Sequence, residues 1–255
     1  MKQMSSNISK RGALLDDTRQ FVSLWDDDLS STANLSLFNE QNLLGLPSQS
    51  RADDVTMYAL RPRFVEPGGD LVRALRFLRD SPAAFSDACY YEASRADQLL
   101  AAFAEGPLVR WYEEGRLGMN ADLTEQWLDE LEKAEMVPAW STSLKRRVAQ
   151  GLLATLRDFG RLQGTKRSPY KEIAGPGISD GGFAYVAYRL HQSGESSRGL
   201  LTTPVWKRWL LDSPRIDQHM HRLAAQGLLY YARAGSTLRI DWRVESLEEV
   251  ARAVA

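Results

Sequence analysis

Basic side chains are concentrated in one stretch of the chain, residues 140–171 (WSTSLKRRVAQGLLATLRDFGRLQGTKRSPYK). This stretch holds eight Lys or Arg and a single acid, Asp158, whereas the whole 255-residue chain has a net charge of −1. A cluster of one sign on a nearly neutral protein indicates a surface that attracts an anion. Nucleic acid is the first candidate, because Arg, Lys and Gln side chains contact its phosphates and base edges.

The spacing of apolar residues predicts a helix from about Ser141 to Phe159, which Gly160 ends. In a helical projection, one side is apolar within about 120° of arc and must face a core. The polar residues on or beside the opposite side are the candidate nucleic-acid contacts Ser143, Arg146, Arg147, Gln150 and Arg157. Lys145 lies at the edge of the apolar side, but from the first turn it can reach a phosphate.

A β-hairpin is expected next, with residues 162–165 paired to residues 170–173. It carries three further candidate contacts, Lys166, Arg167 and Lys171. A helix followed by a basic hairpin resembles the recognition helix and wing of a winged helix, in which the wing lies over the phosphate backbone. The competing interpretation is a solvated helix surface. The single sign of the charge, repeated on the hairpin, favours nucleic acid.

The helix expected just before it, at residues 122–135, is acidic, with six acids against Lys133. These acids could neutralise the basic helix within the protein. Alternatively, the basic surface could dock on an acidic partner protein. RNA also stays open as a ligand, because a basic winged helix can bind either nucleic acid.

The helices and hairpins expected along the whole chain predict a mainly α protein with two domains. Residues 1–118 are expected to form an all-helical N-terminal domain, and residues 119–255 a C-terminal domain of winged-helix type with short β-hairpins. The break is expected at residues 115–120 (GRLGMN). A second hairpin is predicted at residues 228–242, after a helix that Ser213 caps.

The N-terminal half contains the outline of a helix-turn-helix. One helix begins near Ser30, a Gly-containing break follows, and a second helix starts after Ser48 and ends where Pro62 interrupts it. The candidate DNA contacts here are Arg51, Arg61 and Arg63. Asp53 and Asp54 lie among them and would repel phosphates if they faced DNA, so DNA contact and plain packing are weighed equally here.

Motifs for catalysis or cofactor binding are missing from the sequence. It has no GxxxxGK[ST], GxSxG or HExxH pattern, so no enzymatic activity, cofactor or metal is expected. His219 and His221 are two apart and cannot share a metal on a helix. The single cysteine, Cys89, is expected to be a buried thiol.

No run approaches the roughly 18 apolar residues of a membrane span, so a cytoplasmic location is expected.

Several segments resemble the BrxA family, a component of BREX phage-defence systems. The strongest match is residues 143–153 (SLKRRVAQGLL), followed by residues 158–162 (DFGRL). The segments 12–15 (GALL), 40–45 (EQNLLG) and 206–210 (WKRWL) also fit. The resemblance covers nearly the whole chain. It implies helix-turn-helix and winged-helix character, binding of double-stranded DNA without enzymatic activity, and work alongside other BREX components.

Overall fold

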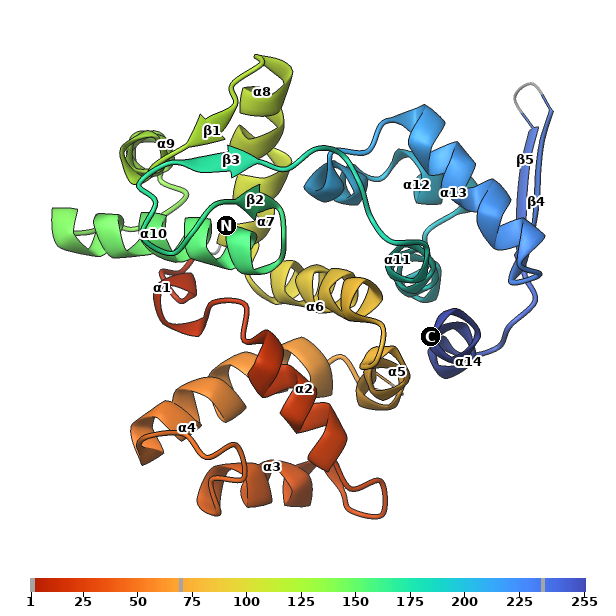
Figure 1. Ribbon diagram of the computed structural model, residues 1–255, viewed down its shortest axis with the longest axis horizontal. Coiled ribbons are helices and arrows are strands. Elements are labelled where there is room, and N and C mark those ends of the chain that lie inside the picture. The colour runs from red at the N-terminus through yellow and green to blue at the C-terminus, as the bar shows by residue number, and fades with distance from the viewer. Residues whose placement is uncertain (1–2, 69–70, 235–236) are drawn as a thin grey trace. The chain divides into compact units, whose positions relative to one another are not determined.

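The computed structural model describes residues 3–68, 71–234 and 237–255 (Figure 1). The protein is mainly helical with a few short antiparallel strands, which confirms the predicted fold class. Its winged-helix character stays a prediction. By contacts, the chain divides into two compact units. Unit 1 comprises Met1–Leu15 and Glu92–Pro176, and unit 2 comprises Asp16–Tyr91 and Gly177–Ala255.

This division differs from the predicted one, since residues 118 and 119 lie inside unit 1. The segment expected as an interdomain break contains the strand Gly118–Met119, which pairs with the strand Lys171–Ile173. Such a pairing between distant parts of the chain leaves no mark in local composition. It makes the segment a part of the sheet in unit 1.

Unit 1 holds five helices and three strands along its described residues. They are α1 (Ile8–Arg11), α7 (Gln98–Glu105), α8 (Pro107–Glu113), β1 (Gly118–Met119), α9 (Ala121–Lys133), α10 (Thr142–Asp158), β2 (Leu162–Gln163) and β3 (Lys171–Ile173). The strands form an antiparallel sheet in the order β1-β3-β2. Leu162 pairs with Ile173 and Gln163 with Glu172, which confirms the first predicted hairpin.

The basic helix α10 is set by its ends and by its apolar side. The Ser141 hydroxyl accepts a hydrogen bond from the Leu144 amide, and Gly160 follows the helix with a φ of 72°. An N-cap of this kind satisfies an amide that has no partner within the helix. Val148 and Leu156 on the predicted apolar side are fully buried. The predicted bounds of this helix are therefore confirmed.

Two helices of unit 1, the acidic α9 and the short α1, pack against α10, and the strand β2 also contacts it (Figure 1). The contact with α1 requires a glycine, because a Cβ on Gly151 would lie 2.9 Å from the Ile8 carbonyl oxygen. Since that obstacle is backbone, a larger residue would force α1 away.

Unit 2 holds the remaining elements. They are α2 (Leu15–Leu24), α3 (Ser31–Glu40), α4 (Gln49–Val55), η1 (Thr56–Val65), α5 (Leu71–Leu78), α6 (Pro82–Ala96, assigned to unit 1 from Glu92 onward), α11 (Asp180–Gln192), α12 (Ser197–Thr202), η2 (Pro204–Trp209), α13 (Ser213–Ala225), β4 (Leu229–Ala234), β5 (Thr237–Trp242) and α14 (Leu247–Val254).

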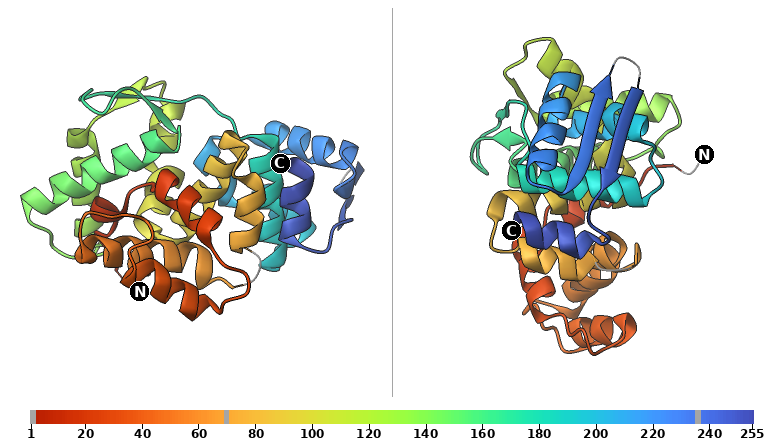
Figure 2. Two further views of the ribbon diagram at one scale, coloured as in Figure 1. Left: turned by 60° about the horizontal axis from the view of Figure 1, so that its bottom comes forward. Right: turned by 90° about the vertical axis from the view of Figure 1, so that its right-hand side faces the viewer.

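The second predicted hairpin is confirmed by the antiparallel pairing of β4 with β5, which form a two-stranded ribbon beside α13 (Figure 2). Its predicted turn at Gly235 and Ser236 lies outside the described residues, as do Gly69 and Asp70. The cap of α13 is Asp212 rather than Ser213, because the Asp212 carboxylate accepts the Arg215 amide.

Two helix predictions in the N-terminal half are wrong. In the sequence, a cap at Ser9 and apolar residues continuing through Trp25 predict a single helix, but positive φ values of 40° at Gly12 and 54° at Leu14 separate α1 from α2. The other was expected to end at Pro62, whereas η1 is a π-helix that continues through it to Val65. Proline clashes with the carbonyl four residues earlier in an α-helix, and the wider π-helical turn relieves that clash.

Within the part of the chain that is described, no helix is both long and apolar enough to cross a membrane.

Candidate nucleic-acid interface

The first turn of α10 carries two predicted contact residues whose charges α9 compensates. The Lys145 amino group lies 2.5 Å from Asp129 and 2.6 Å from Glu132. The Arg146 guanidinium lies 2.7 Å from Glu125 and also pairs with Asp122. The hydrogen bonds that the Lys145 amino group donates to Asp129 and Glu132 raise the pKa of Lys145, which fixes it as a cation.

These ion pairs answer the question of whether the acidic helix neutralises the basic helix within the protein. The acids of α9 neutralise Lys145 and Arg146 within the protein. The Lys145 side chain is only 16% exposed, so it has little access to an external ligand. Arg146 is more exposed, but a phosphate would have to compete with two carboxylates for it.

The other candidate residues of α10 differ in their exposure and in their ion pairing. Ser143, Arg147 and Gln150 are exposed. The Ser143 hydroxyl lies 3.2 Å from that of Ser141. Among the described residues, no carboxylate lies within ion-pair distance of Arg147. Arg157 pairs at 2.6 Å with the neighbouring Asp158, and its side chain is 14% exposed.

The loop between β2 and β3 holds the three other basic candidates. Lys166 and Arg167 are exposed, and neither has an ion-pair partner in the described parts of the chain. Lys171 differs, because it is only 5% exposed. Its amino group donates to the carbonyls of Thr165 at 2.7 Å and Ser168 at 2.6 Å.

Lys171 therefore holds the hairpin loop together rather than reaching outward, contrary to its predicted place among the contacts. Burial lowers the pKa of Lys171, and the charge of Arg157 lowers it further. Its amino group nevertheless satisfies two backbone carbonyls that would otherwise have to be solvated. The position of Lys166 and Arg167 depends on this arrangement.

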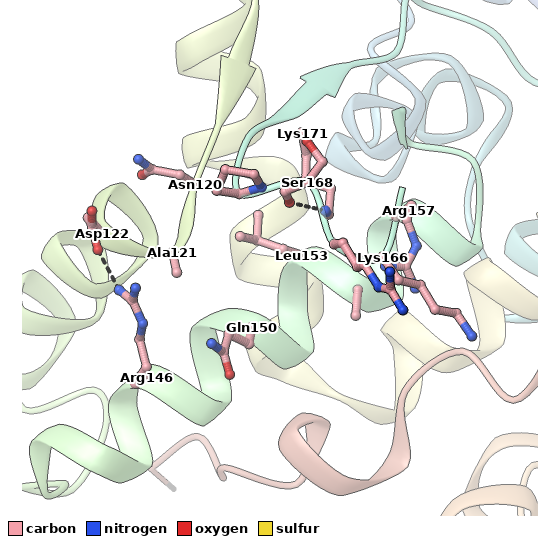
Figure 3. A pocket seen from close by; sticks show the side chains of 13 residues that line it. Asn120, Ala121, Asp122, Arg146, Gln150, Leu153, Arg157, Lys166, Ser168 and Lys171 are labelled. Atoms are coloured by element: carbon pink, nitrogen blue, oxygen red, sulfur yellow. Dashed lines mark hydrogen bonds and ion pairs between the residues drawn. The ribbon is translucent and has the colours of Figure 1, made fainter. Parts of the chain in front are cut away.

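A cavity of about 450 Å³ lies between α10, the start of α9 and this loop (Figure 3). It brings together six of the predicted contacts: Arg146, Gln150, Arg157, Lys166, Arg167 and Lys171. Ser143, Lys145 and Arg147 lie outside its lining. Sequence reasoning missed the apolar part of the wall, Leu153, Ala154 and Pro169, and also Asn120. Asn120 could have been found from its place before the acidic helix, where it caps α9.

The helix-turn-helix outline in unit 2 consists of α3, a turn through Gly45, and α4 continued by η1. Each of its predicted contact residues is buried or interacts with an acid within the protein. Arg63 is 3% exposed and cannot reach a ligand, which corrects that prediction. Arg61 pairs with Glu66 at 3.1 Å. Arg51 lies close enough to Asp17 to act on its pKa, which burial raises and the Arg51 charge lowers.

The two histidines of α13 have separate surroundings. His219 is buried, lies 2.9 Å from Asp180 and stacks on the Phe183 ring. His221 lies 3.5 Å from Asp217. The described residues hold no group of three or more His, Cys, Asp or Glu that could bind a metal ion. Cys89 is buried, as the sequence predicted.

The fold and site define a mainly helical protein with a basic cavity beside a short hairpin. The family model for BrxA matches residues 2–178, and the chain belongs to the BrxA family. This membership confirms the resemblance noted in the sequence and suggests a component of a BREX phage-defence system.

Among solved structures, the protein is similar to the crystal structure of an uncharacterized protein from Magnetospirillum magneticum. The TM-score is 0.60 at 16% sequence identity, over 75% of this chain and 95% of that one. At this identity the likeness concerns the fold alone. No curated protein matches the chain.

Proposed function

We propose that this BrxA-family protein is a non-enzymatic, DNA-binding component of a BREX phage-defence system. It contacts duplex DNA through the exposed side of α10 and the β2–β3 loop. The observation that carries the proposal is the set of three exposed cations, Arg147, Lys166 and Arg167, that have no carboxylate partner among the described residues. They are free to exchange water and salt ions for phosphates.

The roles follow from the chemistry of each side chain. Lys166 and Arg167 contact the phosphate backbone and contribute affinity that falls with salt. Gln150, exposed on α10, suits the bidentate pairing that glutamine makes with adenine. Arg147 lies beside it on the same helix. Lys145, Arg146 and Lys171 support this surface by holding α9 and the loop in place.

The proposal places the protein in the cytoplasm, where phage DNA enters, and beside other BREX components. It assigns no catalytic step, since the sequence has none of the phosphate-cradling or nucleophile motifs considered above. An acidic protein partner is the weaker alternative, because α9 already supplies the carboxylates that the first turn of α10 attracts.

The test is fluorescence anisotropy of the full chain with duplex DNA, single-stranded DNA and RNA of one sequence, across a salt series. With three phosphate contacts, the slope of log K against log salt for the duplex is expected near about −3. The triple variant Arg147→Ala, Lys166→Ala, Arg167→Ala should lose most of this slope.

Lys133→Ala is the matched control, because Lys133 is an exposed lysine on α9 outside the cavity. It should leave the duplex affinity within about twofold. If the triple variant binds duplex like the wild type, the assigned surface is wrong. Tighter binding of RNA than of duplex would replace DNA by RNA as the ligand.

A further inference from the structure

The cavity beside α10 has a property that backbone contact does not require, namely a concave volume. Contact with a phosphate backbone needs only an exposed basic surface. Cavities of roughly 300 to 1,000 Å³ are the ones that hold small molecules. At about 450 Å³, the cavity beside α10 lies within that range. Its lining therefore indicates what it could take up.

The charge of the lining calls for an anion. Five basic side chains and one acid line the cavity, and that acid, Asp122, is paired with Arg146. Lys171 is buried in the wall, and its amino group touches carbonyls rather than a carboxylate among the described residues. A buried cation without a counter-charge is unfavourable, so an anion in the cavity would be attracted to it.

The rest of the wall suits a flat, polar-edged ring. Leu153, Ala154 and Pro169 supply an apolar surface. Gln150 projects from α10 between Arg146 on one side and Arg157 and Lys166 on the other (Figure 3). Its side-chain amide has no hydrogen-bond partner within the described structure, so it can donate and accept at once.

We propose that this cavity binds a single nucleotide, with its phosphate at Lys166 and Arg167 and its base against Ala154 and Gln150. The nucleotide has two possible sources, a free mononucleotide or one nucleotide turned out of a nucleic-acid strand. This inference goes beyond the proposed duplex binding, because a free nucleotide can occupy the cavity whether or not DNA is bound.

The test is calorimetric titration of the full chain with AMP, adenosine and inorganic phosphate. AMP should bind one site, at least about tenfold more tightly than adenosine or phosphate, because each of these makes only part of the contacts. Ala154→Phe fills the cavity and should weaken AMP binding at least about tenfold. Lys133→Ala, at an exposed position on α9 outside the cavity, should leave AMP binding within about twofold of the wild type.

A second probe separates the two sources. An oligonucleotide that carries 2-aminopurine gains fluorescence when that base is unstacked. If AMP does not bind but the wild type raises this fluorescence and Ala154→Phe does not, the nucleotide comes from a strand. Gln150→Glu repeats both tests with an exposed position, in case Ala154→Phe unfolds the protein.

The inference is overturned if neither probe responds, or if both blocked variants respond like the wild type. This failure is distinct from failure of the proposed function. If only the inference about the cavity fails, the wild-type protein still binds duplex DNA in a salt-dependent way, but neither nucleotide probe responds. If the proposed function fails, the wild-type protein does not bind duplex DNA at all.

Discussion

The first turn of α10 and the β2–β3 loop each carry two neighbouring cations, but only those of α10 have carboxylate partners among the described residues. Lys145 and Arg146 each contact two carboxylates of α9. Lys166 and Arg167 contact none among the described residues. The sequence presents both pairs as one basic surface. The structure shows that a count of charges measures the charge present, whereas the charge available to a ligand depends on partners in space.

The largest expected effect comes from the loop. Lys166→Gln with Arg167→Gln should weaken duplex binding on the order of 100-fold at low salt and flatten the log–log salt slope by about 2. The reason is that two unpartnered cations, each able to release counterions, are removed. Anisotropy titration over the salt series measures both quantities.

The first turn provides the matched comparison. Lys145→Gln with Arg146→Gln removes the same charge from the chain, but should weaken duplex binding less than about fivefold. It should instead lower the melting temperature, because four acids of α9 lose their partners. If both double variants lose binding equally, the difference between the two regions has no functional meaning.

Releasing Arg146 should act in the opposite direction, with a smaller effect than that of the loop variant. Asp122→Asn with Glu125→Gln leaves Arg146 without its carboxylates and should strengthen duplex binding by about three- to tenfold. Glu130→Gln with Glu135→Gln makes the same charge change on or next to α9, at acids without ion pairs in the described structure. A gain as large in this control would mean that net charge alone sets the affinity.

Lys171 tests the support beneath the loop. Lys171→Met keeps most of the length of the side chain but removes the donor to the Thr165 and Ser168 carbonyls. The loop should become mobile on a nanosecond timescale and duplex affinity should fall by about threefold, since Lys166 and Arg167 are no longer held in place. NMR relaxation of the loop amides and anisotropy together check this result.

The smallest effect is expected in the predicted helix-turn-helix of unit 2. Arg61→Ala should leave duplex affinity within about twofold, because Arg61 is engaged by Glu66. The same assay measures it, with wild type as the reference. A tenfold loss would show that this helix also contacts DNA and that pairing with a carboxylate does not withdraw an arginine from binding.

Local signals predicted much of the fold. Ser141 and Gly160 set the ends of α10, and residues 162 and 163 pair with residues 172 and 173 as the predicted hairpin requires. The failed predictions have two causes, which are pairing between distant parts of the chain and an uncommon backbone geometry. The strand at Gly118 exists because β3 lies beside it, and Pro62 is tolerated because the backbone widens into a π-helix.

The candidate site shows the same limit. The helical projection placed Gln150 and Arg157 correctly near one another, and the cavity contains both. It could not show that Lys171 turns inward, because lysine is usually exposed and nothing local distinguishes this one. It also could not choose between solvent and α9 as the partner of Arg146, since the two helices meet only in the folded protein.

The contact of α1 with α10 at Gly151 has a consequence for synthesis. Ile8–Arg11 leaves the ribosome early, whereas α10 begins at Thr142. At ribosomal rates, the interval is roughly 7 to 26 seconds. A four-residue helix is not stable alone, so α1 must wait unfolded while much of unit 2 is made. The surface that carries Arg147 and Gln150 is therefore completed late, after translation has passed residue 158.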